Sequence, residues 1–293
     1  MIIVKLMGGL GNQMFEYAIG RALSLRHSTA LKMDTTFLLD RTPREAGFVF
    51  RDFDLGIFNI TASFATPAEV AALNKKLFDS KKADKLLRKI LGKQPTYFKE
   101  PHFEFYPEIF SLGPDVYLEG YWQSEKYFKE YEAVIRQDFT FKAPLSAAAA
   151  TLLAEMNNRQ AVCVNVRRGD FVTNAYHGTT GLDYYKAGEA LIASSIHTPH
   201  FYVFSDDVQW CEENLHFDHP TTYVSHAYAG EKFRDYLQLM TNCRHFIIPN
   251  SSFGWWAAWL SQHNGKIVVA PKQWFGEGNA NTKDLLPQDW VKC

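Results

Sequence analysis

The stretch 161–170 decides the fold of this chain: Ala161-Val162-Cys163-Val164-Asn165-Val166-Arg167-Arg168-Gly169-Asp170. Its first six residues are mostly apolar and predict a buried β-strand. The four residues that follow carry charge and a glycine. Ligands of open α/β sheets bind outside the carboxyl ends of the strands, so a charged strand end is a candidate site.

Short apolar runs alternate with helical stretches on both sides of this strand. We expect strands at 200–204, 222–224, 246–248 and 267–270, and helices at 183–195, 206–215, 231–243 and 252–262. This alternation is typical of βαβ units and a parallel sheet. The first half opens similarly, with a strand at 2–6, a glycine-rich turn and a helix at 12–26. The length favours two domains, and we place them at 1–150 and 151–293.

Composition excludes several classes of function. Lysine plus arginine total 31 and aspartate plus glutamate total 32, a formal net charge of −1. A general nucleic-acid binder needs a cationic excess, so we expect no nucleic-acid partner. No apolar run approaches the roughly 18–20 residues that cross a bilayer. The four cysteines form no CxxC pair or zinc pattern, and the start has no signal-peptide pattern, so we expect a cytoplasmic protein.

The segment 75–93, which begins at Lys75 and ends at Lys93, is basic. It has eight basic residues and two acids, with an apolar stripe. The simpler interpretation is a helix with a solvated basic face. The alternative is peripheral contact with an anionic inner membrane near a lipid-linked acceptor.

Polar residues follow each expected strand. Arg167 and Arg168 follow the first, and two guanidinium groups could grip a diphosphate and neutralise it without a metal. The alternative is that Arg168 pairs with Asp170 and Arg167 caps a helix. Ser205, Asp206 and Asp207 follow the second strand, and Asn250, Ser251, Ser252 and Phe253 follow another. Ser, Asp and Asn are also ordinary helix N-cap residues. There is no HExxH motif and no His/Cys cluster, so we expect no metal.

The glycine turn after residues 2–6 allows a second interpretation. Gly9-Leu10-Gly11 after a strand resembles a dinucleotide-binding turn. The third glycine of that motif falls at Met14, which would obstruct close packing of helix on strand. The sequence therefore disfavours a nicotinamide or flavin oxidoreductase.

Five ordered blocks carry a family resemblance. Residues 8–18, GGLGNQMFEYA, resemble the N-terminal signature of the bacterial α-1,2-fucosyltransferases, and residues 117–128, YLEGYWQSEKYF, resemble a second block. Residues 166–170, VRRGD, are similar to the HxRRxD motif of α-1,2- and α-1,6-fucosyltransferases. Residues 204–207, FSDD, and 250–260, NSSFGWWAAWL, match two further blocks.

The resemblance implies an α/β fold of the GT-B type, with two Rossmann-like domains facing across a cleft. It implies a metal-independent, inverting transfer of fucose from GDP-β-L-fucose to the 2-hydroxyl of a terminal β-galactoside, with no cofactor. The N-terminal domain would be the acceptor side and the C-terminal domain would hold the donor. The acceptor would be a galactose-terminated oligosaccharide or lipid-linked glycan, in bacterial surface glycan synthesis.

The resemblance also assigns residues. Arg167 would bind the β-phosphate, while Arg168 and Asp170 would hold the loop and assist; these three are the expected catalytic residues. Asp235 would face the guanine base. The remaining expected donor-binding residues are Gly11, Asn12, Gln13, Asn165, Ser205, Asp206, Asp207, Asn250, Ser251, Ser252 and Phe253.

The chain departs from the family pattern at Asn165, which stands in place of the histidine of HxRRxD. Asparagine can form hydrogen bonds but does not titrate near neutral pH. Asp170, Glu16 and Glu119 are candidates for the general base by location only, and a water-relayed proton transfer is equally open. Two alternatives to the α-1,2 assignment remain: an α-1,6 or other fucosyl linkage, and a non-catalytic sugar-binding protein.

Overall fold

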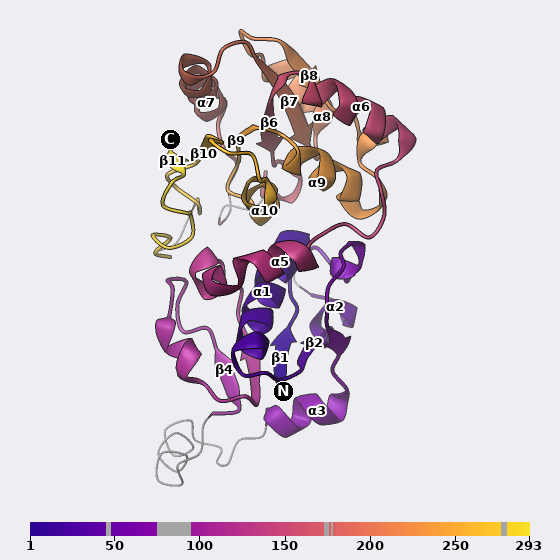
Figure 1. The fold of residues 1–293 in the computed structure, drawn as a ribbon, viewed down its shortest axis with the longest axis vertical. Coiled ribbons are helices and arrows are strands. Elements are labelled where there is room, and N and C mark those ends of the chain that lie inside the picture. The colour runs from indigo at the N-terminus through magenta and orange to yellow at the C-terminus, as the bar shows by residue number, and fades with distance from the viewer. Residues whose placement is uncertain (45–47, 75–94, 173–175, 177, 277–279) are drawn as a thin grey trace. The chain divides into compact units, whose positions relative to one another are not determined.

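The computed structural model describes residues 1–44, 48–74, 95–172, 176, 178–276 and 280–293. The chain divides into two compact units: unit 1 holds residues Met1–Thr140 and Asn281–Leu285, and unit 2 holds Phe141–Ala280 and Leu286–Cys293. Figure 1 colours the chain from indigo to yellow along its length. Residue 150, where we expected the domain boundary, lies within helix α6 of unit 2.

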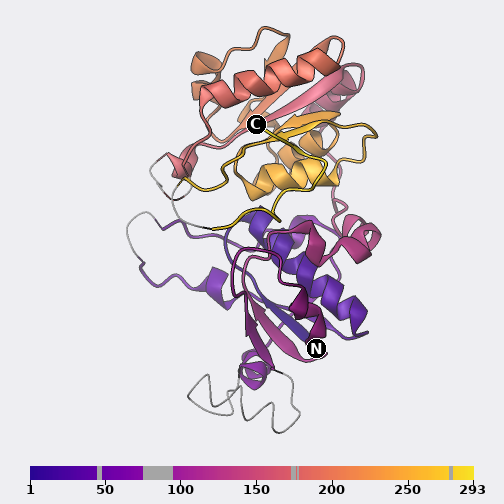
Figure 2. The ribbon, with the colours of Figure 1, turned by 90° about the vertical axis from the view of Figure 1, so that its left-hand side faces the viewer.

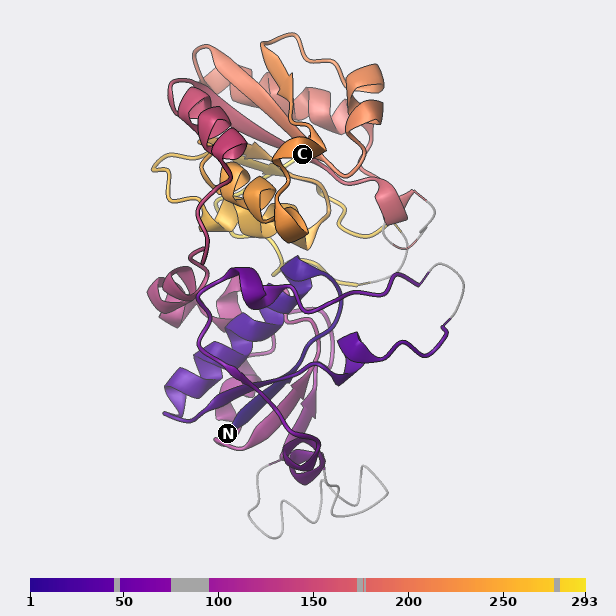
Figure 3. The same ribbon diagram turned by 90° about the vertical axis from the view of Figure 1, so that its right-hand side faces the viewer.

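Unit 1 is built on a parallel sheet in the order β3-β2-β1-β5-β4. Its strands are β1 (Ile2–Lys5), β2 (Leu31–Asp34), β3 (Ser63–Phe64), β4 (Tyr97–Lys99) and β5 (Val116–Glu119). Its helices are α1 (Leu10–Arg26), α2 (Thr36–Leu39), α3 (Pro67–Leu73) and α5 (Glu132–Asp138). Helix α1 runs along the sheet (Figure 3). On the opposite face Ile3 and Tyr117 pack with Leu73 of α3. The predicted strand and helix at 2–6 and 12–26 are confirmed as β1 and α1.

Unit 2 is built on a six-stranded parallel sheet in the order β11-β10-β9-β6-β7-β8. Its strands are β6 (Gln160–Val166), β7 (Pro199–Ser205), β8 (Thr221–Tyr223), β9 (His245–Ile247), β10 (Val268–Ala270) and β11 (Val291–Lys292). Its helices are α6 (Ala147–Asn157), α7 (Leu182–Ser195), α8 (Val208–Asn214), α9 (Arg234–Thr241) and α10 (Ser252–Leu260).

The central strand β6 is buried on both sides, as its apolar run predicts. Successive side chains point to opposite faces of a sheet. Val162, Val164 and Val166 therefore share one face, where they pack with Tyr185 and Ile192 of α7. Figure 2 shows α7 lying across the sheet on this side. Asn165 points to the other face, where a side chain on Gly254 of α10 would meet it. Helices on both faces make unit 2 doubly wound.

One predicted helix begins later than expected. The pattern at 231–243 predicts one continuous helix, but α9 begins at Arg234, after a short 3-10 turn. Lys232 and Phe233 have φ values of 52° and 58°, a left-handed conformation that a right-handed helix cannot include. The amide of Asp235 donates to the carbonyl of Ala229 at 3.0 Å and closes this turn.

Among the described residues, no helix combines the length and apolar character needed to cross a membrane. The basic segment 75–93, for which we considered membrane contact, lies outside the described residues.

Candidate active site

The candidate site of unit 2 lies where the strand order reverses. The chain passes from β6 outward through β7 and β8, then returns to β9 on the other side of β6. Such a reversal separates the loops that follow the two central strands and leaves a crevice for a ligand. Arg167 follows β6 and Asn250 follows β9, so both lie at this switch point.

Asp206 organises the arginine pair. Its Oδ2 lies 2.8 Å from Nη1 of Arg167, and its Oδ1 accepts the backbone N–H of Arg168 at 2.9 Å. Arg167 also forms an ion pair with Asp170. The sequence predicted Asp206 as a donor-binding residue; in the structure its carboxylate holds both arginines. A guanidinium has five N–H donors, so contacts with two carboxylates leave capacity for an anion.

Arg168 is fixed by side chains from α8 and its N-cap. Its Nε lies 3.3 Å from Oδ2 of Asp207. Its Cζ lies 3.5 Å from the centre of the Trp210 ring, a close cation–π contact. Asp207 is also the N-cap of α8, because its side chain accepts the N–H of Trp210 at 3.2 Å. The N-cap alternative for Asp207 is therefore confirmed, and the same residue holds Arg168.

Gly169 is required by the close approach of Asp206. A Cβ at this position would lie 2.5 Å from Oδ2 of Asp206, far inside ordinary contact. The glycine therefore allows the carboxylate to reach Arg167. The sequence shows only that a glycine stands at this strand end; its contact with Asp206 depends on the tertiary structure.

Asn165 is largely buried and faces the protein interior. Its Nδ2 donates to the carbonyl of Phe204 at 3.1 Å, and its Oδ1 would lie 2.7 Å from a Cβ on Gly254. Asn165 thus links β6 to β7 and lies close to Gly254 of α10. Its predicted contact with the donor stays a prediction.

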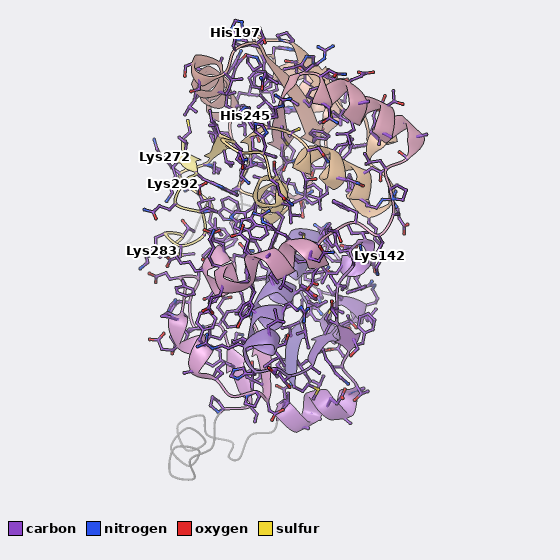
Figure 4. All side chains as sticks on the ribbon, in the orientation of Figure 1. Lys142, His197, His245, Lys272, Lys283 and Lys292 are labelled. Atoms are coloured by element: carbon purple, nitrogen blue, oxygen red, sulfur yellow. The ribbon has the colours of Figure 1, made fainter. Side chains whose placement is uncertain are left out.

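The loop after β9 supplies further polar groups. Asn250 donates from Nδ2 to the carbonyl of Trp274 at 3.0 Å and accepts from the hydroxyl of Thr180 at 3.3 Å. Ser251 is the N-cap of α10, and Ser252 and Phe253 form its first turn. The N-terminus of a helix attracts anions through its N–H groups and its dipole. Asn250 lines a cavity of about 330 Å³ together with Thr180, Tyr184 and Lys272. Lys272 is labelled in Figure 4.

Both carboxylate oxygens of Asp235, the residue expected to face guanine, already accept hydrogen bonds within the protein. The Asp235 side chain is fully buried, and its Oδ2 accepts the backbone N–H of Ser146 at 3.0 Å. Its Oδ1 accepts from Arg234 at 2.8 Å. Burial alone raises the pKa of the Asp235 carboxyl. The hydrogen bonds from Ser146 and Arg234 outweigh this effect and hold the pKa below its ordinary value. Recognition of guanine by Asp235 therefore stays a prediction that requires Arg234 to move.

His226 is a further candidate residue of this site that the sequence analysis did not identify. Its Nε2 lies 2.9 Å from the carbonyl oxygen of Ser205, at the carboxyl end of β7. The sequence showed only a histidine between β8 and α9. Because His226 is far from Ser205 along the chain, the sequence could not predict their contact.

His245, labelled in Figure 4, is buried in β9. Burial and the neighbouring His263 lower the pKa of His245 to about 4, so it is a poor candidate for a base.

The expected donor-binding residues of unit 1 differ in burial. Gln13 is fully buried: its Nε2 donates to the carbonyls of Gly8 at 3.0 Å and Asp52 at 2.8 Å. Its Oε1 accepts the N–H of Asp54 at 2.9 Å. Gln13 thus ties two loops together inside the unit, and its predicted contact with the donor stays a prediction. Gly11 is buried, whereas Asn12 is partly exposed and accepts from Gln123 at 2.9 Å.

The three suggested bases differ sharply in environment. Glu16 is fully buried, which raises its pKa well above the ordinary value. For Glu119, burial raises the pKa, but Lys99 and Lys5 outweigh this and lower it overall. Asp170 forms an ion pair with Arg167. Glu16 is too enclosed to reach a substrate, and Glu119 is already paired with cations, so neither is a suitable base.

A profile of Glycosyl transferase family 11 matches residues 78–293. The chain belongs to glycosyltransferase family 11. An α-1,2-colitosyltransferase of Escherichia coli is 30% identical over 99% of this chain and 98% of its own length. The O-antigen biosynthesis glycosyltransferase WbnK of the same organism is 30% identical over 98% of both chains. A galactoside 2-α-L-fucosyltransferase of Caenorhabditis elegans is 25% identical, covering 100% of this chain and 79% of its own.

The solved structure of a mutant of Arabidopsis thaliana FUT1 in complex with GDP is similar in fold. It has a TM-score of 0.52 and 10% identity, covering 93% of this chain and 71% of that one. Together with the two parallel sheets, this likeness confirms the predicted α/β fold of the GT-B type. The resemblance to the bacterial α-1,2-fucosyltransferase family is likewise confirmed. Family membership makes the chain a glycosyltransferase of the fucosyltransferase type and disfavours the non-catalytic alternative.

Proposed function

We propose that this protein transfers L-fucose from GDP-β-L-fucose to the 2-hydroxyl of a terminal β-galactoside, with inversion and without a metal. The observation that carries the proposal is the Arg167–Arg168 pair at the switch point of unit 2, held by Asp206. Paired guanidinium groups match the geometry of a diphosphate. Unit 2 would hold the donor, and unit 1 would hold the acceptor.

The chemistry requires charge stabilisation on the leaving group. The acceptor hydroxyl oxygen forms a bond to the anomeric carbon as the bond from that carbon to the β-phosphate oxygen breaks. Negative charge then grows on GDP. Arg167 would stabilise that charge at the β-phosphate, and Arg168 together with the N-terminus of α10 would support it. Glu16 and Glu119 are unsuited to accept the hydroxyl proton, which leaves Asp170 or a late transfer to water as its destination.

The metal-free mechanism is supported by the composition of the site. Arginine supplies the positive charge that a divalent ion would otherwise supply.

A second donor is favoured by one relative. The α-1,2-colitosyltransferase of Escherichia coli matches nearly the whole chain. Transfer of colitose from GDP-colitose is therefore the alternative activity on the same site.

The acceptor in either case would be a galactose-terminated oligosaccharide or lipid-linked glycan of a bacterial surface polymer. We place the reaction in the cytoplasm, peripheral to the inner membrane. Sedimentation with anionic vesicles tests the membrane contact of the segment 75–93.

The test is incubation of the purified protein with lactose and equal concentrations of GDP-fucose and GDP-colitose, in chelator, with mass detection of the trisaccharide. A fucosylated product with an α-1,2 linkage by NMR supports the proposal. A colitosylated product supports the alternative donor, and an α-1,6 product corrects the linkage. No product and no GDP release from either donor would contradict both assignments.

A matched pair of variants tests the arginine. Arg167→Ala should abolish transfer while the protein stays folded. Arg159→Ala is the control, because Arg159 precedes the same strand at its opposite end and contacts His200 at the surface. Near-normal turnover of folded Arg167→Ala would show that the phosphate role is wrong.

A further inference from the structure

Trp122 adopts a strained backbone at the carboxyl edge of the unit 1 sheet. Its φ is 54°, an uncommon conformation for a bulky residue that persists only where the surroundings enforce it. Its side chain is 1% exposed and packs with Phe98 and Tyr127. Trp122 follows β5 closely, at the edge where a parallel sheet binds ligands. Strain at such an edge points to a functional turn.

Glu100 enforces this turn. It directly follows β4, the neighbour of β5, and its Oε2 accepts the N–H of Tyr121 at 2.8 Å while its Oε1 accepts the N–H of Trp122 at 3.1 Å. The amide of Glu100 donates to the carbonyl of Glu119 at 2.8 Å, so backbone and side chain are both fixed. A Cβ on Gly120, whose φ is 158°, would lie 2.4 Å from Cβ of Glu100. Glycine is therefore needed for the carboxylate to reach the turn.

Two amide side chains meet beside the turn, the largely buried Gln123 and the partly exposed Asn12. Gln123 follows Trp122, and its Nε2 donates to Oδ1 of Asn12 at 2.9 Å. Asn12 lies in the first turn of α1, which follows β1, the other neighbour of β5. Loops from three adjacent strands thus meet at one edge. Amide groups both donate and accept hydrogen bonds, which suits the hydroxyl groups of a sugar.

Two acids, the fully buried Glu16 and the half-buried Glu100, lie at this edge. Glu16 accepts the N–H of Met7 at 2.9 Å through Oε2, and its Oε1 finds no hydrogen-bond partner among the described residues. Burial raises the pKa of Glu100 to about 7. Shifted pKa values are typical of carboxyl groups at functional sites and less so of surface ion pairs. The sequence reasoning missed Glu100, because nothing in its local sequence marks it.

We propose that Glu100 is a positioning residue for the acceptor: it holds the strained turn at Trp122 so that Gln123 and Asn12 meet the hydroxyl groups of a galactoside. This assignment rests on the proposed function, in which unit 1 receives the acceptor. Glu100 contributes through the turn and does not itself touch the sugar.

Glu100→Gln tests the proposal. The amide offers one accepting oxygen to two backbone N–H groups, so the turn loses a hydrogen bond while the side-chain shape is kept. We expect the KM for lactose to rise by about tenfold, the upper end for the loss of one ordinary hydrogen bond. The KM for GDP-fucose and the rate of GDP release without acceptor should stay within about twofold. Glu108→Gln, a change of the same kind at an exposed position of unit 1, should leave all of these constants unchanged.

Gln123→Ala gives a second route to the same readout. It should raise the KM for lactose without the backbone effect, and the double variant with Glu100→Gln should be non-additive, because both act on one turn. An unchanged lactose KM in Gln123→Ala would overturn the proposal even if Glu100→Gln fails to fold. An equal rise in the KM for GDP-fucose would also overturn it, because the effect would then be general.

A binding measurement separates this proposal from the proposed function. Saturation-transfer NMR reports lactose bound to the protein without any donor. If the wild-type protein binds lactose but uses neither nucleotide sugar, the donor assignment fails and the Glu100→Gln comparison still stands. If lactose gives no signal with the wild-type protein, or an undiminished signal with Glu100→Gln, the assignment of this edge to a saccharide is overturned.

Discussion

Gly169→Ala should lower the transfer activity while the protein stays folded. The new Cβ would lie 2.5 Å from Oδ2 of Asp206, whereas ordinary contact begins at 3.4 Å. The carboxylate must therefore retreat by about 0.9 Å, and it is the flexible end of a side chain, so the fold accommodates the change cheaply. The same movement breaks the 2.8 Å contact with Arg167. A misplacement of about 1 Å near a reacting group costs roughly 100-fold in rate.

We therefore expect kcat/KM for transfer from GDP-fucose to fall by about 100-fold and the affinity for GDP, measured by calorimetry, to fall with it. The midpoint of thermal unfolding should change by no more than about 4 °C, the effect of roughly 1 kcal/mol. Gly181→Ala is the matched control, because nothing lies within 4 Å of a Cβ there and its φ of −73° suits alanine. A folded Gly169→Ala protein that keeps a third or more of the wild-type kcat/KM would refute the role of Asp206.

Three further predictions concern the same two units. Trp210→Ala removes the ring that lies 3.5 Å from Arg168, so kcat/KM should fall by about tenfold, equivalent to a cation–π contact of roughly 1.4 kcal/mol; an unchanged value would show that Asp207 alone fixes Arg168. Glu16→Gln should flatten the pH dependence of stability. Burial raises the pKa of Glu16, so its protonated form stabilises the fold below the ordinary pKa of about 4.3, and this stability is lost as pH rises toward the folded-state pKa, by up to about 1.4 kcal/mol per pH unit. Chemical denaturation between pH 5 and 8 measures the slope, and identical slopes in both proteins would contradict this. Chelator should leave transfer unchanged, and a strong loss restored by a divalent ion would disprove the metal-free mechanism.

The sequence by itself predicted β1, β6, β7, β8, β9 and β10 and the polar motifs at several strand ends, whereas it did not predict β3, β4, β5 or β11. The apolar runs at β1, β6, β7 and β9 are short, and helices separate them. Polar residues follow each run. These patterns predict structure well because burial and turn formation depend directly on the local residue types. The Arg167-Arg168-Gly169-Asp170 stretch was recognisable for the same reason. The Met14 argument against a dinucleotide site is also local.

Only the tertiary structure decided which partners these residues have. Asp206 and Asp207 read equally well as N-cap residues and as ligands, and their contacts with the arginines come from an adjacent strand 38 or more residues away. Glu100 accepts a hydrogen bond from a turn 21 residues further along the chain. The side-chain amide of Gln13 donates to a loop 39 residues away. The burial of Glu16 and the late start of α9 were likewise hidden. A single sequence fixes local preference, whereas pairing across strands depends on register and packing, and those arise only when the sheets form.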